Sequence, residues 1–302
     1  MTSKAARQQA QPSIPALTLT FLRAAALACL CAASFAQAQP AKPAEYTPQV
    51  GQDGKDVIWV PTPPMIIERM LRMTQVTPRD LVVDLGSGDG RVAIAAAKDF
   101  GARSRGLEYN PDMVALSKRE AIKAGVADRV SFEEADIFKT NFSNATVVTM
   151  YLLPNLNLQL RPTLLKMKPG TRIASHQFDM GDWEPDETAD LAGRQTHFWL
   201  VPAEVAGTWK LKTSAASGAG AREFEVAFKQ TFQKISGSHA VANGRSGLRE
   251  PRLRADQIHF ALVDDRGVQH DFEGTVNGTK ISGQIRSAGG RPVAFEGSRT
   301  GD

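Results

Sequence analysis

Cysteine is almost absent from this sequence. Of 302 residues only two are cysteines, and both, Cys29 and Cys31, lie within the first 38 residues. The rest of the chain therefore offers no thiol nucleophile, no structural disulfide and no cysteine-ligated zinc site. The five histidines are scattered without metal-ligand spacing, so the sequence predicts no metal centre.

A strong charge of one sign is also lacking. The formal net charge is +4, from 36 basic and 32 acidic residues, and Lys4, Arg7 and Arg23 are the only charged residues in 1–38. Removing these three bases from the 36 leaves 33 bases against 32 acids. Because no dense Lys/Arg run remains, the sequence argues against nucleic acid as a partner.

No apolar run near the N-terminus is long enough for a transmembrane helix, which needs about 20 residues. The stretch Ala24–Phe35 follows a basic region that ends at Arg23 and precedes Ala36-Gln37-Ala38, the arrangement of a signal peptide. This predicts export, with the bacterial periplasm as the expected compartment and cleavage after Ala38. The lack of cysteine in the mature chain fits an oxidising compartment. An uncleaved interfacial anchor is the alternative.

Composition and periodicity divide the chain into four parts. Residues 1–38 are the predicted signal peptide, and the Pro-rich residues 39–54 are a predicted flexible lead-in. Residues 55–202 alternate strand-like and helix-like segments, which predicts a doubly wound, Rossmann-like α/β sheet with right-handed crossovers. Residues 203–302 alternate apolar and polar side chains with period two, and hairpin turns such as Asn277-Gly278 punctuate them. They predict a small antiparallel all-β domain, a sandwich or barrel, of unknown role.

The α/β part has a definite expected order of elements. Strands are expected at Leu81–Leu85, Ser104–Glu108, Val130–Glu134, Thr146–Leu153, Arg172–Phe178 and His197–Val201. Helices are expected from Pro63, with Thr62 as the N-cap, and over Val92–Phe100, Pro111–Ala124 and Leu156–Lys168. Only residues 178–195 separate the last two strands, which leaves little room for the usual crossover helix.

A glycine-rich turn, Asp84–Arg91, follows the first predicted strand. Ligands of doubly wound sheets bind at the carboxyl ends of the strands, and glycines allow a ligand to approach the backbone closely. The glycines are Gly86, Gly88 and Gly90. The third comes one residue early for the dinucleotide fingerprint, and the carboxylates of Asp84 and Asp89 would repel a pyrophosphate. The turn therefore disfavours a nicotinamide-dependent oxidoreductase and fits S-adenosylmethionine (SAM), which carries a sulfonium and an ammonium group.

Two further acids follow the next predicted strands. Glu108 ends the second strand, where a carboxylate can accept hydrogen bonds from both ribose hydroxyls. Asp136 follows the third strand, where it can accept from an adenine amino group, with Ile137 against the ring. Three acids at successive strand ends, together with the glycine turn, predict a SAM site.

Residues 57–185 resemble the class I, seven-β-strand, SAM-dependent methyltransferases. They resemble in particular a lysine methyltransferase group with archaeal enzymes and mitochondrial enzymes that act on the ATP synthase c-subunit and the adenine nucleotide translocase. The matching stretches are Trp59-Val60-Pro61-Thr62, Asp84–Arg91, Glu108-Tyr109-Asn110-Pro111, Val147–Pro154, Ser175–Phe178 and Trp183-Glu184-Pro185. The resemblance implies SAM as the cofactor and a protein lysine as the acceptor. The β domain lies outside it, and a signal peptide is unusual because SAM is made in the cytoplasm.

The acceptor side has weaker candidates. Many amine methyltransferases of this superfamily place an Asn/Asp-Pro-Pro-aromatic motif after the fourth strand, and Tyr151 stands there in this sequence. Its hydroxyl or ring face could hold an amine, or the ring packs in the core. His176 is a candidate general base or a structural histidine. Trp59 and Trp183 either wall the pocket or pack.

Three functions remain open from the sequence. The leading one is an exported methyltransferase that acts on an amine, with a protein lysine as the expected acceptor. A small-molecule or lipid amine is the nearest rival acceptor. The third is an exported module that binds SAM without turnover while the β domain binds another ligand. The sequence carries no signal for an oligomeric state.

Overall fold

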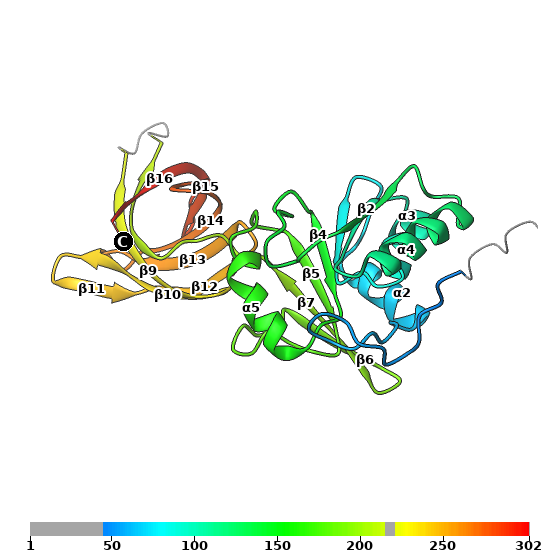
Figure 1. The fold of residues 1–302 in the computed structure, drawn as a ribbon. Coiled ribbons are helices and arrows are strands. Elements are labelled where there is room, and N and C mark those ends of the chain that lie inside the picture. Colours follow the sequence, from blue (N-terminus) through cyan, green and yellow to red (C-terminus); the bar gives the residue numbers. More distant parts are fainter. Residues whose placement is uncertain (1–44, 215–220, 302) are drawn as a thin grey trace, which may run out of the picture. The chain divides into compact units, whose positions relative to one another are not determined.

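The computed structural model describes residues 45–214 and 221–301. The predicted signal peptide, its cleavage site after Ala38 and residues 39–44 of the lead-in lie outside the described residues. Two β-sheets follow one another along the described chain (Figure 1). The strands of the first sheet lie within residues 55–202 and those of the second within residues 203–302.

The first sheet has seven strands in the order β3-β2-β1-β4-β5-β7-β6. The strands are β1 (Leu81–Leu85), β2 (Arg103–Glu108), β3 (Val130–Glu134), β4 (Val147–Met150), β5 (Arg172–His176), β6 (Glu187–Leu191) and β7 (Arg194–Leu200). The helices are α2 (Pro64–Met73), α3 (Arg91–Phe100), α4 (Pro111–Lys123) and α5 (Pro154–Leu164). Strands β1 to β5 are parallel, which confirms the doubly wound α/β prediction. None of the helices in the described ranges is long and apolar enough to cross a bilayer.

Strand β1 lies in the interior of this sheet, between β2 and β4, and positions the glycine turn. Its sequence, Leu-Val-Val-Asp-Leu, is almost wholly apolar, and four of its five residues are buried. Such continuous burial is expected for a parallel strand covered by helices on both faces. Helix α3 buries four small or branched residues against the sheet: Val92, Ala93, Ala96 and Ala97. The turn between β1 and α3 is therefore fixed at both ends.

The predicted element bounds need correction at the carboxyl edge of the sheet. Strand β4 ends at Met150 and β5 at His176, so Tyr151–Leu153 and Gln177–Phe178 are loop residues. Helix α5 begins at Pro154 because a proline is favourable in the first turn of a helix. Helix α2 begins at Pro64, and its N-cap is Pro63. The prediction of Thr62 as the N-cap was wrong.

Strand β6 was not predicted. The short segment between β5 and β7 forms an edge strand that pairs antiparallel with β7 through a turn at Ala192 and Gly193. Strand β7 in turn runs antiparallel to β5. A hairpin needs no crossover helix, which explains how 178–195 can be so short.

The second sheet has nine antiparallel strands in the order β11-β10-β9-β8-β16-β15-β14-β13-β12. The strands are β8 (Gly207–Thr213), β9 (Glu223–Thr231), β10 (Lys234–Val241), β11 (Gly244–Gly247), β12 (Arg249–Arg254), β13 (Gln257–Val263), β14 (Gln269–Asn277), β15 (Lys280–Ser287) and β16 (Val293–Gly301). The two edge strands, β11 and β12, are joined only by Leu248, so the sheet curls into a near-barrel (Figure 1). Phenylalanine rings fill its interior, with Phe260 and Phe272 stacked at 4.7 Å. This confirms the predicted antiparallel β domain.

Candidate active site

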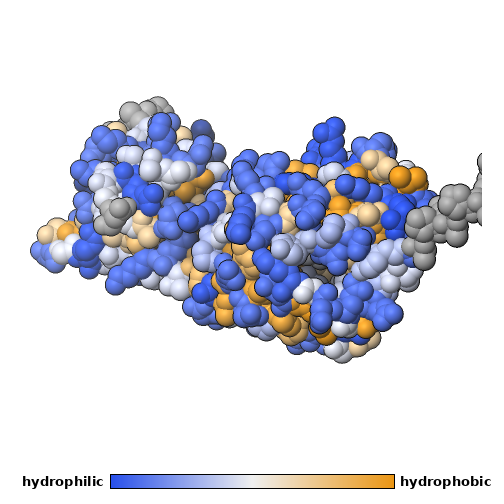
Figure 2. All heavy atoms as spheres, viewed as in Figure 1, coloured by the Kyte–Doolittle hydropathy of each residue, from blue (hydrophilic) through white to orange (hydrophobic). Residues whose placement is uncertain are grey.

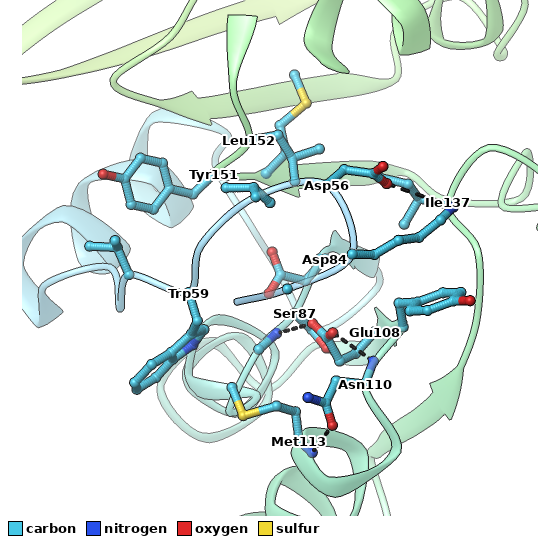
Figure 3. A pocket seen from close by; sticks show the side chains of 18 of the residues that line it. Asp56, Trp59, Asp84, Ser87, Glu108, Asn110, Met113, Ile137, Tyr151 and Leu152 are labelled. Carbon is cyan, nitrogen blue, oxygen red and sulfur yellow. Dashed lines mark hydrogen bonds and ion pairs between the residues drawn. The ribbon is translucent and has the colours of Figure 1, made fainter. Parts of the chain in front are cut away.

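A cavity of about 310 Å³ opens at the carboxyl edge of the parallel strands (Figure 3). Its size is within the usual range for small-molecule sites, about 300–1,000 Å³. Most of its lining residues form three groups: the N-terminal segment from Gln52 to Thr62, the glycine turn after β1, and the loops after β2, β3 and β4. The sequence pointed to residues of the last two groups and, in the first, offered Trp59 as a pocket wall.

The N-terminal segment forms a strap across the cavity, here defined as residues 51–60. Hydrogen bonds close it at its base, from Gly51 N to Trp59 O and from Trp59 N to Gln52 O, each 2.9 Å. A Cβ atom on Gly88 would lie 2.6 Å from Trp59 Nε1. The absent side chain of Gly88 therefore lets the strap pack directly on the glycine turn.

The three glycines of the turn do not share one role. All three have positive φ angles: 71° at Gly86, 54° at Gly88 and 81° at Gly90. Gly86 and Gly88 line the cavity as predicted, but Gly90 does not. A Cβ on Gly90 would lie 2.6 Å from the ring of Phe132 in β3. Gly90 therefore serves close packing of α3, and its predicted contact with the cofactor needs correction.

Glu108 ends β2 with both carboxylate oxygens held by backbone amides. Gly88 N donates to Oε2 at 2.8 Å, and Asn110 N donates to Oε1 at 2.9 Å. An ionised carboxylate has about four acceptor sites, so capacity remains for a diol. The glycine turn thus fixes the orientation of the acid that was predicted to bind ribose.

Asp84 is buried at the end of β1 and lines the cavity. Thr149 Oγ1 donates to its Oδ1 at 2.6 Å. Burial is the main cause that raises the pKa of Asp84 to about 7; the nearby charges of Glu108 and Asp89 act in the same direction, and the Thr149 hydrogen bond acts against it. A cation in the cavity would favour the ionised form of this carboxyl group.

Asp89 also lines the cavity, but its charge is neutralised within the turn. Arg91 holds its carboxylate by two donors, with Nε 2.9 Å from Oδ1 and Nη2 2.6 Å from Oδ2. The same guanidinium donates from Nη1 to the carbonyl of Thr62 at 3.2 Å. The prediction that Asp89 adds negative charge for a cationic ligand did not anticipate this pairing.

Asp136 and Ile137 line the cavity as predicted, but Asp136 already has partners. Phe138 N donates to Oδ1 and Lys55 Nζ donates to Oδ2, each at 3.0 Å. The hydrogen bond from Lys55 holds the pKa of Asp136 below its usual range. Lys55 belongs to the strap, and its Nζ lies 5.0 Å from the centre of the Tyr109 ring. Sequence reasoning missed Lys55 because 81 residues separate it from its partner.

The acceptor candidates lie elsewhere in the cavity. Tyr151, Trp59 and Phe178 line it, and Figure 3 shows Tyr151 and Trp59 on the side opposite Glu108 and Asn110, with Asp84 between them. We call the Glu108 side the cofactor half and the Tyr151 side the acceptor half. Tyr151 therefore lines the cavity, and its role toward an acceptor stays a prediction.

His176 and Trp183 lie outside the cavity. His176 is fully buried behind Tyr151, and burial, with the charge of Arg194, lowers its pKa to about 4. Trp183 is fully buried between Trp199 and Phe232, with ring centres 6.1 and 6.0 Å away. Trp183 packs in the core, and the alternative of a pocket wall is wrong for it.

Exposed apolar side chains surround the cavity. Ile58 and Val60 of the strap and Leu153 before α5 line it and are 52%, 36% and 37% exposed. In the space-filling view, apolar residues gather over the region of α5 (Figure 2). Exposed apolar residues that cluster around a cavity commonly mark a surface that another molecule covers.

The charge of the cavity fits SAM. Within the described residues, neither Asp84 nor Glu108 has an ion-pair partner, so the cofactor half is acidic. Such a site suits a ligand with sulfonium and ammonium charges and opposes a phosphate. Glu108 and Asp136 would hold the nucleoside, and Asp84 would face the cationic groups.

Comparison with known proteins agrees with this assignment. A family model described as the ANTKMT methyltransferase domain matches residues 84–187. A protein-lysine N-methyltransferase of Saccharolobus islandicus (strain REY15A) is 44% identical over 144 residues, 47% of this chain and 89% of the relative. The ATP synthase c-subunit lysine N-methyltransferase of Mus musculus is 36% identical over 131 residues, 43% of this chain and 52% of the relative.

A solved structure is also similar in sequence. It is described as an RNA methyltransferase from Salinibacter ruber in complex with S-adenosyl-L-homocysteine, at 49% identity, and covers 48% of this chain and 96% of its own, with a TM-score of 0.48. The present chain spans nearly all of the archaeal relative and about half of the mouse one.

Proposed function

The chain belongs to the SAM-dependent protein-lysine N-methyltransferase family, and from this premise we propose that its cavity methylates the side-chain amine of a lysine in a protein substrate. One observation carries the proposal: a single cavity joins an acidic cofactor half to an aromatic acceptor half. The name of the archaeal relative supports the choice of lysine.

Residues of the cofactor half would bind SAM, and residues of the acceptor half would bind the lysine. SAM supplies an already activated methyl group when it is bound. Transfer then depends mainly on proximity, orientation and exclusion of water. Glu108 and Asp136 would hold the nucleoside, and the strap covers the cavity. In the acceptor half, the rings of Tyr151 and Trp59 would bind the lysine as its ammonium ion because aromatic faces attract cations. The ammonium must then lose a proton to solvent before its nitrogen lone pair can displace the methyl group from the sulfonium.

The surroundings of the cavity favour a protein over a small amine as the acceptor. A small amine would be enclosed by the acceptor half alone. The exposed Ile58, Val60 and Leu153 extend an apolar surface beyond it. Apolar neighbours of the acceptor lysine can pack on this surface and contribute binding energy.

The test is methyl transfer to defined probes. Full-length protein is incubated with SAM and a capped peptide containing one lysine, the same peptide with that lysine acetylated, and an RNA oligonucleotide. Mass spectrometry should find methyl groups on the free lysine alone. Methylation of RNA, or of neither probe while calorimetry still shows SAM binding, would refute the lysine assignment.

A matched pair of variants ties the activity to this cavity. Glu108→Gln should weaken SAM binding and slow methylation at limiting SAM, since a hydrogen bond to a charged acceptor contributes about 1.5–3 kcal/mol. Glu134→Gln is the control. It lies beside Glu108 in the β2–β3 register, is exposed and does not line the cavity. Equal loss in both variants would point to damage of the sheet.

The same proposal includes export. Its support is the basic, apolar and Ala-x-Ala order of residues 1–38. N-terminal mass spectrometry of protein from a bacterial envelope fraction should find a chain that begins at Gln39. A chain with an intact N-terminus in the cytoplasmic fraction would contradict export without affecting the assignment of the cavity.

A further inference from the structure

The ring of Tyr151 rests on a buried histidine. Tyr151 follows the last residue of β4, and His176 is the last residue of β5, so the two are neighbours across the parallel register. Their ring centres are 4.0 Å apart with a tilt of 38°. Phe178 lies further from Tyr151, with ring centres 6.3 Å apart. The closest aromatic support of Tyr151 is therefore His176.

His176 is itself fixed from the other side. Its Nδ1 lies 3.3 Å from the hydroxyl of Thr62, which is 5% exposed and directly precedes the N-cap of α2. The carbonyl of Thr62 accepts from Arg91, whose guanidinium holds Asp89 in the glycine turn. Contacts thus run from the cofactor half through Thr62 and His176 to the ring of Tyr151.

Stability does not explain a histidine at this position. Its Nε2 is buried and has no hydrogen-bond partner among the described residues. A buried polar atom without a partner is destabilising, and an apolar ring of similar size would avoid it. Local choices that oppose stability are expected at functional sites.

A role as general base does not fit either. His176 does not line the cavity, and the ring of Tyr151 lies against it. Its pKa, lowered to about 4, makes the imidazole a weak proton acceptor, whereas a general base works best with a pKa near the operating pH. The contact it makes is with Tyr151, so its effect on an acceptor would pass through that ring.

We propose that His176 is a positioning residue: it holds the Tyr151 ring in the one orientation that receives the acceptor amine. The assignment of the amine to lysine rests on the proposed function, whereas the placement of the ring does not. Loss of the His176 ring leaves Tyr151 free to rotate, which weakens acceptor binding and leaves the cofactor half intact.

The kinetic test uses His176→Asn, which keeps a polar group near Thr62 and removes the ring. The KM for the lysine peptide should rise about 2- to 10-fold, which is the free energy of one aromatic pair expressed as a ratio of binding constants. The KM for SAM should stay unchanged. In a Tyr151→Ala background the same substitution should have no further effect. A rise in the KM for SAM, or a full effect in the Tyr151→Ala background, would overturn the proposal.

His197→Asn is the matched control. His197 is also a buried histidine of this sheet, with Nδ1 3.0 Å from the hydroxyl of Thr188, but its ring contacts Trp199. It should lower the melting temperature to a similar extent without changing the KM for the peptide. An equal rise of this KM in His197→Asn would show a general loss of stability.

A spectroscopic test needs no acceptor. The chain has three tyrosines, Tyr46, Tyr109 and Tyr151, so ring-labelled tyrosine gives three NMR signals that single substitutions assign. His176→Asn should move the Tyr151 signal and leave the Tyr109 signal in place, and His197→Asn should move neither. An unmoved Tyr151 signal overturns the positioning role even if the protein methylates lysine. A moved signal supports it even if the acceptor proves to be another amine.

Discussion

At the scale of single residues, Asp84 is a buried carboxyl group that lines the cavity and lowers the stability of the fold at neutral pH. Its pKa rises from 3.8 to about 7 on folding. The folded state therefore binds a proton at Asp84 more tightly than the unfolded state does. The resulting contribution to the free energy of unfolding is complete below pH 3.8 and is lost as the pH rises to about 7. We expect Asp84→Asn to stabilise the protein above that pH by up to about 4 kcal/mol, and by little near pH 4. Urea unfolding at both pH values measures this.

Asp80 is the control for Asp84, with the opposite sign. Burial alone would raise the pKa of Asp80, but hydrogen bonds from Thr146 and Arg172 lower it below its usual value. Ionised Asp80 therefore stabilises the folded state at pH values above the pKa that Asp80 has in the unfolded chain. This stabilisation is lost as the pH falls through the lower pKa that Asp80 has in the folded protein. Asp80→Asn should therefore destabilise the protein at neutral pH. If both variants destabilise equally at neutral pH, the pKa of Asp84 is not raised.

The affinity for SAM should depend on pH through the same residue. Cationic groups in the cavity favour ionised Asp84, so binding near neutral pH releases its proton. Affinity is expected to rise by up to about tenfold per pH unit below about pH 7 and to level off above it. Calorimetry in buffers of different ionisation enthalpy detects the released proton. A pH dependence that persists in Asp84→Asn would assign the proton to another group.

The candidate site residues that the sequence could identify lie at the carboxyl ends of the parallel strands, within the strand or just after it. Asp84, Glu108 and Asp136 could be found because the carboxyl ends of parallel strands converge. The pairing of Asp89 with Arg91 and the packing role of Gly90 depend on side-chain directions within one turn. Such local geometry leaves no periodic signal in a sequence.

At the scale of elements, the strap presents the main departure from the sequence prediction. Residues 51–54 were predicted as part of a flexible lead-in, and the strap carries no helix or strand. Its order comes from contacts with residues far along the chain, such as Lys55 with Asp136. Strand β6 was missed for a similar reason, because it is a short edge strand whose only partner is β7.

Lys55 should compete with the cofactor for Asp136. If the adenine amino group binds this carboxylate, the Lys55 hydrogen bond must be given up or shared. We expect Lys55→Met to tighten SAM binding by about two- to fivefold, the range of a partly exposed ion pair, and added salt to reduce the difference. Calorimetry at low and moderate salt measures both effects.

Lys139→Met provides the control for Lys55. Lys139 lies 3.5 Å from the same carboxylate but is 83% exposed and is not part of the strap. It should change SAM affinity less than Lys55→Met does. Weaker binding in Lys55→Met would show that the strap lysine holds the cofactor in place and does not compete with it.

At the scale of the whole molecule, the change of periodicity near residue 202 predicted that an antiparallel sheet follows the α/β sheet, and the first strand of that sheet begins at Gly207. A contact between the two parts was not predictable. The turn between β9 and β10 places Phe232 against Trp183, which lies between β5 and β6, and Lys234 pairs with Glu184 at 2.7 Å. Phe232 has a positive φ of 55°, which suits a tight turn. A packing contact of one turn residue cannot be inferred from alternation alone.

Residues 39–202 should therefore bind SAM without the β domain but be less stable than the full chain. Among the described residues, all that line the cavity lie between Gln52 and Phe178, so truncation removes none of these. It does remove Phe232, which covers the buried Trp183.

In the full chain, Phe232→Ala should reproduce this loss of stability, at about 1–3 kcal/mol. The expected loss is smaller than for a fully buried phenylalanine because the ring is half-buried. Calorimetry with SAM and thermal unfolding of the fragment, the variant and the full chain give both quantities. A folded fragment that no longer binds SAM, or a Phe232→Ala chain with weakened SAM binding, would show that the β domain shapes the cavity and that the two sheets do not work independently.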